Sequence, residues 1–150
     1  MKLSDLQIPT VDVEVGPNAA LTVRGLAGDD IALIVSRHTE EAVKLFEMVT
    51  SREDKGALDR DLVRQLMSKA LQQFPGLVGS IIAAANDDPG AAEPARKLRL
   101  PVQAELLESI VGLTFESETE LEKFVGTIAR GLRTVTSAVK VLDGRRLPTG

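Results

Sequence analysis

The chain contains 150 residues, of which 43% are hydrophobic, 27% charged and 3% aromatic, and its formal net charge is −4. These values are typical of a single globular domain, residues 1–150, with an aliphatic core. The negative charge argues against nucleic acid as the main partner, and the absence of cysteine excludes disulfides, thiolate nucleophiles and cysteine metal sites. The uncharged run at 75–86 is shorter than the roughly 20 apolar residues of a membrane-spanning helix, so no membrane partner is expected.

Residues 1–10 are expected to form a loosely held N-terminal arm. Its apolar side chains, Leu3, Leu6 and Ile8, would tack it onto the core, and Pro9 ends any helix there. The arm has no long apolar run, so it does not resemble a secretory signal.

A short β-hairpin is predicted over residues 11–26. Val11–Val15 alternates apolar and acidic residues, which is the period of a half-buried strand. The sequence GPN at 16–18 favours a turn, and Ala20–Val23 offers a second strand.

After the hairpin the apolar period changes to steps of three and four, which predicts one long amphipathic helix that continues to Val49. Asp29 and Asp30 would lie in its first turn, where the helix dipole favours carboxylates. The residues on the apolar face are Ile31, Ile34, His38, Ala42, Leu45 and Val49.

Three more helices are predicted in the middle of the chain. The second helix runs from about Leu58 to Phe74 and carries an apolar stripe. The third, Pro75–Asn86, is apolar nearly all round, and proline is well tolerated at its first position. A short fourth helix is expected over Ala91–Leu98, where Pro94 limits its length.

Two helices are predicted towards the C-terminus. The first opens at Pro101 and ends near Phe115, and the second follows a capping box formed by Ser117 and Glu120. The helical region then extends to residue 143, and residues 144–150 form a basic tail. The charges are segregated, because residues 102–122 contain six acidic and no basic residues, whereas residues 123–150 contain six basic and one acidic residue.

The candidate chemical sites each have a simple structural explanation. His38 is the only histidine, and Ser36 two positions away on a helix points elsewhere, so a catalytic pair is not expected. The glycine pairs at 25–28 and 76–79 complete no phosphate-binding motif, and the acidic pairs lack calcium-loop spacing. The helix–turn–helix at Phe74–Gly76 offers no side chains that read bases. We therefore expect no enzyme activity, cofactor, metal or small-molecule substrate.

The third predicted helix has two interpretations. An apolar helix must be buried by something, either the rest of this chain or a partner. In the first case Pro75–Asn86 is the central core helix, and in the second it receives an apolar helix of another protein. The candidate partner contacts are Leu77, Val78, Ile81 and Ile82.

The run DVEVGPNAALTVRGLAGDDIALIVSRHTEEAVKLFE resembles the opening of the tail assembly chaperones, or pre-tape-measure proteins, of long-tailed bacteriophages. The shared features are a short extended segment that leads to VRGL at 23–26, an acidic–apolar pair at 30–31 and RH at 37–38. A second similarity is Leu100-Pro101, which opens a helix that ends in LTF at 113–115.

The resemblance implies a phage or prophage protein that binds the long apolar helices of the tape measure protein and keeps it soluble. Such a chaperone acts in the cytoplasm of the infected bacterium and is absent from the mature virion. The alternative is a structural tail or head–tail connector protein that oligomerises and stays in the particle, and a homo-oligomer is possible in either case. The expected fold is α+β and predominantly α-helical, with the hairpin followed by about five packed helices.

Overall fold

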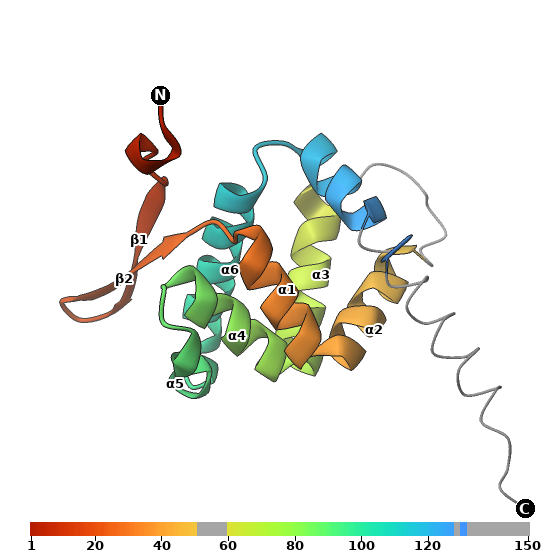
Figure 1. The fold of residues 1–150 in the computed structure, drawn as a ribbon. Helices are drawn as coiled ribbons and strands as arrows, with labels where there is room; N and C mark the ends of the chain where they lie inside the picture. Colours follow the sequence, from red (N-terminus) through yellow and green to blue (C-terminus); the bar gives the residue numbers. More distant parts are fainter. Residues whose placement is uncertain (51–59, 128–129, 132–150) are drawn as a thin grey trace, which may run out of the picture.

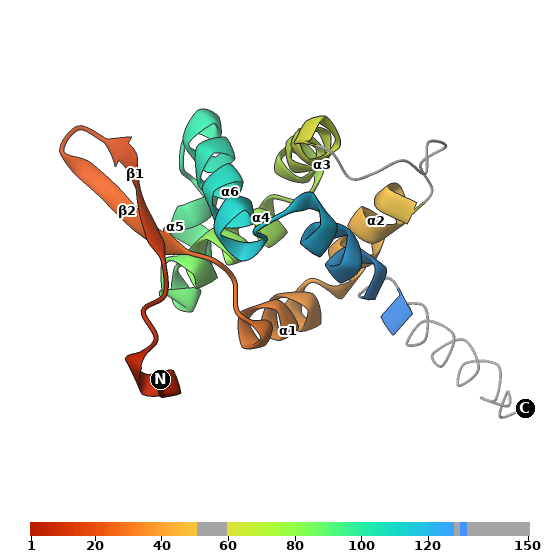
Figure 2. The ribbon, with the colours of Figure 1, turned by 90° about the horizontal axis from the view of Figure 1, so that it is seen from above.

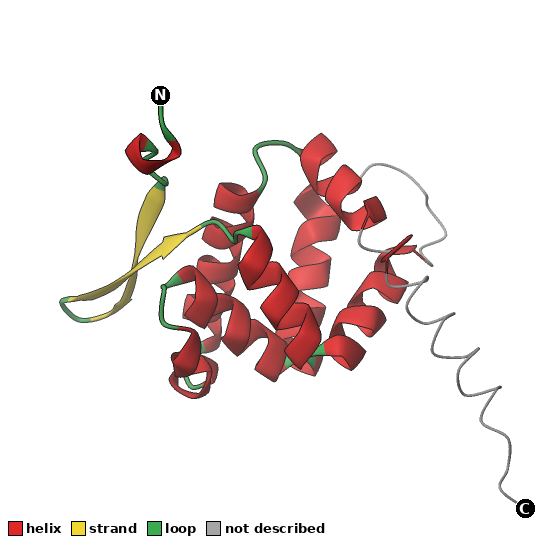
Figure 3. Ribbon diagram, viewed as in Figure 1, coloured by secondary structure: helices red, strands yellow, loops and turns green. Residues whose placement is uncertain are grey.

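The computed structural model describes residues 1–50, 60–127 and 130–131, and it shows a hairpin joined to a cluster of helices (Figures 1 and 3). The predominantly helical α+β fold predicted from the sequence is confirmed. The principal elements are β1 (Thr10–Gly16), β2 (Ala19–Arg24), α1 (Gly28–Arg37), α2 (Thr39–Thr50), α3 (Arg60–Gln73), α4 (Pro75–Ala85), α5 (Ala92–Arg96) and α6 (Leu100–Thr114). Residues 118–127 are also helical, and single 3₁₀ turns lie at Leu3–Asp5 and Pro89–Ala91.

The hairpin is a two-stranded antiparallel sheet that extends from the helical part of the molecule (Figure 1). The turn between the strands places Asn18 at φ 57°, a conformation that asparagine tolerates better than most residues. One face of the sheet contacts α6 and buries Val13 and Val23, whereas on the other face the Thr22 hydroxyl donates a hydrogen bond to Asp12 (2.6 Å). The alternating sequence of β1 therefore forms a sheet with one buried face.

Helix α4 lies in the middle of the helical cluster and contacts α1, α3, α5 and α6 (Figures 1 and 2). Its sequence has no charged residue, and seven of its residues are buried. A Cβ added at Gly79 would lie 2.7 Å from the Ala92 carbonyl oxygen, so glycine permits the close approach of α5. Most of α4 is therefore buried by this chain itself.

Helix α6 forms the second buried element and joins the hairpin to the helices. It packs against both strands as well as α3 and α4, with Leu106 and Ile110 almost fully buried. Its buried polar side chain, Gln103, donates hydrogen bonds to the carbonyls of Ala95 (2.9 Å) and Arg96 (3.0 Å). Gln103 thus satisfies carbonyl groups at the end of α5 that have no partner within the helix.

The prediction of one long helix after the hairpin is wrong, because the helix ends at Arg37 and a new one begins at Thr39. His38 has φ −127° and ψ 46°, outside the helical region. The Thr39 hydroxyl donates to the Val35 carbonyl (2.9 Å), a bond that bends helices, and the His38 ring bonds to Ser80 on α4. The apolar period continues across the bend and conceals it.

The expectation that the arm is tacked onto the core is also wrong. All of residues 1–10 are exposed, and Leu3, Leu6 and Ile8 are 90%, 52% and 60% accessible. The hydrogen bonds within the arm hold a local turn: the Asp5 N–H donates to the Lys2 carbonyl and the Leu6 N–H to the Leu3 carbonyl. The apolar side chains of the arm therefore remain without cover.

The capping box at the last predicted helix is present in a modified form. The Glu120 N–H donates to the Ser117 hydroxyl (3.2 Å), as expected, but the Glu120 carboxylate accepts from the N–H of Glu116 and not from that of Ser117. The other helices agree with the predictions within a few residues at their ends. Residue 58, where the second helix was expected to begin, the helical region at 132–143 and the basic tail at 144–150 lie outside the described residues.

Candidate binding groove and the junction beside it

An open apolar groove runs between the helices and has a volume of about 230 Å³. It is lined by residues of α1, α2, α3, α4, α6 and the segment 115–125. Half-buried side chains on its walls include Val35, Phe46, Met67, Ile81 and Phe124. Among the described residues that line it none is charged, so this part of the groove offers contact area but little directional bonding.

The volume of the groove indicates what it can hold. An apolar cavity of about 150 Å³ accommodates benzene, so a larger one has room for roughly two aliphatic side chains. Each such side chain contributes about 1.5–3 kcal/mol when it leaves water. The groove is therefore suited to anchor residues on an apolar helix rather than to a polar small molecule.

The structure places the four residues predicted as partner contacts in two different environments. Leu77, Val78 and Ile81 line the groove, but Leu77 and Val78 are only 3% and 1% exposed and form its floor. Ile82 is 1% exposed and does not line the groove. Ile81 is the most accessible of the four.

Most of the groove could not be predicted from the sequence, because its walls come from separate segments. Met67 and Phe124 belong to the apolar stripes of their own helices, whereas Val35 and Phe46 each lie one position beyond the predicted apolar face at 31–49. Such a stripe shows that a face is covered but not which helices cover it. No local signal distinguishes these side chains from ordinary core residues.

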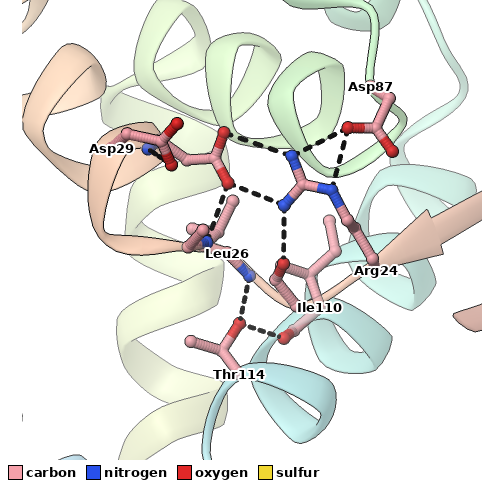
Figure 4. A network of polar contacts seen from close by, with 9 residues as sticks. Arg24, Leu26, Asp29, Asp87, Ile110 and Thr114 are labelled. Atoms are coloured by element: carbon pink, nitrogen blue, oxygen red, sulfur yellow. Dashed lines mark hydrogen bonds and ion pairs between the residues drawn. The ribbon is translucent and has the colours of Figure 1, made fainter. Parts of the chain in front are cut away.

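Arg24, the second residue of the VRGL stretch, is the centre of a polar network beside the groove (Figure 4). Its guanidinium forms two hydrogen bonds with Asp30 (2.7 and 3.2 Å) and contacts Asp87 at 2.9 Å. It also donates to the Gly25 carbonyl (2.9 Å). Arg24 thereby links β2, the first turn of α1 and the turn after α4.

The two ion pairs of Arg24 are not equivalent. The Arg24 and Asp30 side chains are only 15% and 14% exposed, whereas the Asp87 side chain is 71% exposed. The hydrogen bond from Arg24 is the main reason that the pKa of Asp30 lies below its ordinary value, and the Ala27 N–H adds to the effect. The pKa of Arg24 is raised by its hydrogen bonds with Asp30 and then Asp87. The Asp30 pair is therefore the stronger structural contact, since exposed pairs contribute little.

Gly25 and Leu26 hold this junction against the end of α6. A Cβ at Gly25 would lie 2.6 Å from the Leu113 carbonyl oxygen, so no larger residue fits without a backbone shift. The Leu26 N–H donates to the Thr114 hydroxyl (2.9 Å), which in turn donates to the Ile110 carbonyl (2.6 Å; Figure 4). The VRGL stretch is thus a packing junction that positions α1, and with it one wall of the groove, against α6.

His38 is a tertiary contact at the bend between α1 and α2. Its Nε2 lies 2.8 Å from the Ser80 hydroxyl, and its ring faces Gly76 at the start of α4. Ser36, the nearer serine in sequence, donates instead to the Leu33 carbonyl (2.9 Å). The His38–Ser80 pair therefore fixes the position of the bend over α4.

In the ranges 1–50, 60–127 and 130–131, no group of three or more histidine and acidic side chains could hold a metal ion. No helix in the described part of the chain has the length and apolarity needed to cross a membrane.

Comparison with known proteins shows a match to one protein family. The model of the family described as pre-tape measure protein matches residues 1–146, which confirms the resemblance seen in the sequence. No curated protein and no solved structure matches the chain.

Proposed function

We propose that this protein is a chaperone of the tape measure protein. The premise is that the chain belongs to the pre-tape measure protein family and has a role in phage tail assembly. The chaperone binds apolar helices of the tape measure protein and keeps them soluble until the tail tube forms around them. The observation that carries the proposal is the apolar groove, whose described lining exposes half-buried aliphatic and aromatic side chains and includes no charged residue.

The bound element is an amphipathic or apolar helix of the tape measure protein. Such a helix repeats its apolar residues at steps of three and four, so two adjacent anchors can enter the groove together. Aliphatic walls accept different anchors with similar affinity, which suits a chaperone that covers a long and varied sequence. Several copies bound along one tape measure would cover it without recognising a single motif.

The same proposal assigns the protein no catalytic role and no cofactor. It acts in the cytoplasm of the infected bacterium and leaves before the virion is complete. Mass spectrometry of purified virions tests this part, and stoichiometric recovery of the chain from virions would favour a structural tail or connector protein instead.

The binding step is tested by co-expression with the cognate tape measure protein. Val35→Ser and Ile81→Ser each make one wall of the groove polar, and we expect a five- to thirtyfold loss of affinity, which corresponds to about 1–2 kcal/mol. Leu33→Ser is the matched control, because Leu33 lies on the same helix as Val35 but is 41% exposed and outside the groove. The measurements are the soluble fraction of the tape measure protein and its co-purification, with circular dichroism as the control for folding.

Different outcomes of this experiment test the binding site and the chaperone function. If the wild type keeps the tape measure protein soluble and both groove variants do so equally well, binding takes place elsewhere on the molecule. If even the wild type neither binds nor solubilises its tape measure protein, the chaperone function is wrong.

A further inference from the structure

The N-terminal arm holds two exposed leucines, Leu3 and Leu6, on one side of a 3₁₀ turn. The 3₁₀ turn at Leu3–Asp5 is closed by the Leu6 N–H, which donates to the Leu3 carbonyl at 3.1 Å. Residues three apart in a 3₁₀ turn lie one above the other, so Leu3 and Leu6 project from the same side. They are 90% and 52% exposed, and Lys2 and Asp5 supply one charge of each sign beside them.

A second concave surface, the α3–α6 cleft, lies between α3, α6 and the segment 115–121 and has a volume of about 400 Å³. It adjoins the apolar groove, with which it shares Val63, Met67, Val111, Phe115 and Leu121. Its apolar part includes Val63, Met67 and Val111. The charged residues that line the cleft are Arg60, Arg64, Glu108, Glu116 and Glu118. Arg64 and Glu108 form only a long contact (3.8 Å) and are 63% and 64% exposed, so this pair is solvated and weak.

We propose that the arm of one copy of this chain docks in the α3–α6 cleft of a second copy. The arm and the cleft each combine apolar side chains with charges of both signs, so they are complementary. Leu3 and Leu6 would cover the apolar part, while Lys2 would meet the carboxylates of the cleft and Asp5 its arginines. The fully apolar groove offers no partner for these two charges, which favours the α3–α6 cleft as the docking site.

The size and direction of the arm suit a contact between copies. An unfolded segment of ten residues exposes on the order of 1,500 Å², and about half of that equals the roughly 800 Å² that each partner contributes to a stable interface. In its own copy the arm projects on the side of the molecule away from α3 (Figure 2). Each copy has one arm and one cleft on different surfaces, so the contact can repeat from copy to copy.

Because the chain contains no cysteine, paired thiols can test the contact directly. Ser4→Cys places a thiol beside the two leucines of the arm. Gly112→Cys places one in the α3–α6 cleft, where an added Cβ meets nothing within 4 Å. Gly90→Cys is the matched control, since Gly90 is equally free of neighbours within 4 Å but lies outside the cleft.

We expect a mixture of the Ser4→Cys and Gly112→Cys proteins to form a disulfide-linked heterodimer under mild oxidation, at least tenfold faster than a mixture of Ser4→Cys with Gly90→Cys. Equal rates would overturn the proposal. A double variant, Ser4→Cys with Gly112→Cys, that forms only an internal disulfide would show that the arm closes on its own copy, which also overturns it.

Sedimentation velocity supplies a second measurement, which needs no introduced cysteine. The wild type should self-associate, and the pair Leu3→Ser and Leu6→Ser should weaken association at least tenfold without a change in the circular dichroism spectrum. Leu100→Ser is the control, because Leu100 is 56% exposed but lies outside both the arm and the cleft. A wild type that is monomeric at about 0.1 mM would overturn the proposal. Neither experiment contains tape measure protein, so failure here leaves the proposed chaperone function standing.

Discussion

Gly25→Ala is the substitution whose effect follows most directly from the structure. The new Cβ would lie 2.6 Å from the Leu113 carbonyl oxygen, 2.8 Å from its carbonyl carbon and 3.0 Å from the Thr114 nitrogen. All three are backbone atoms of α6, so no side chain can rotate away. Gly25 does not have a positive φ, so the requirement for glycine here comes from close packing and not from backbone conformation.

The magnitude can be estimated from the two contacts that must change. Overpacking at such a site costs about 1–3 kcal/mol. Displacement of α6 also strains the 2.9 Å hydrogen bond from the Leu26 N–H to Thr114, and a hydrogen bond of this kind contributes about 1 kcal/mol. Alanine restricts the unfolded chain and returns about 0.4–1 kcal/mol. We therefore expect the free energy of unfolding to fall by about 1–3 kcal/mol, or the melting temperature by about 3–10 °C.

The assay is urea denaturation followed by circular dichroism, with Gly112→Ala as the matched control. Gly112 lies in α6, and a Cβ there meets nothing within 4 Å. The same chemical change should therefore stabilise the protein by about 0.5–1 kcal/mol, because glycine is unfavourable inside a helix. If Gly25→Ala leaves stability unchanged or raises it as Gly112→Ala does, the packing argument for the VRGL junction is refuted.

Three further predictions concern the core, the ion pair and the bend. Ile82→Ala should lower the free energy of unfolding by about 2–5 kcal/mol in the same urea assay, because Ile82 is 1% exposed; a loss below about 1 kcal/mol would contradict its place in the core. Asp30 has a lowered pKa, so its contribution to stability is present above its unfolded pKa of about 3.9 and is lost as pH falls through the folded value. Asp30→Asn should therefore be less stable than the wild type at pH 7 and should show a smaller loss between pH 5 and 2; parallel stability curves for the two proteins would contradict the pairing with Arg24. His38→Gln should change the free energy of unfolding by less than about 1 kcal/mol, since an amide can bond to Ser80 in its place; a change above about 2 kcal/mol would show that the imidazole ring itself is needed at the bend.

Local patterns in the sequence were sufficient to predict the hairpin and most of the helices. The alternation in Val11–Val15 and the turn residues before Ala19 specify the hairpin, because the strand period and the turn conformation depend on adjacent residues. Pro75 and the turn after Ala85 bound α4 for the same reason. The VRGL stretch carried the family resemblance, although its sequence alone does not reveal what its residues contact.

The bend at His38 shows where local patterns fail. The apolar residues before and after it keep helical spacing, and the signal for a break lies only in Thr39, Glu40 and Glu41, which begin a new helix. The Thr39 hydroxyl bonds back to Val35, but the position of the bend is fixed by Ser80, 42 residues later in the chain. The apolar period depends on the residues of one helix face, so it contains no information about that contact.

The sequence by itself thus determined the aliphatic character of the core, the family and the order of the elements apart from the division between α1 and α2, because these depend on residue type and on neighbours within a few positions. Only the tertiary structure decided that Ile82 is core while Ile81 reaches the groove, that Gly25 is required by the backbone of α6, and that Leu3 and Leu6 stay uncovered. Each of these outcomes depends on which segments distant in sequence meet in space. The apolar pattern requires only that a face be covered, and many arrangements of the helices satisfy that requirement equally well.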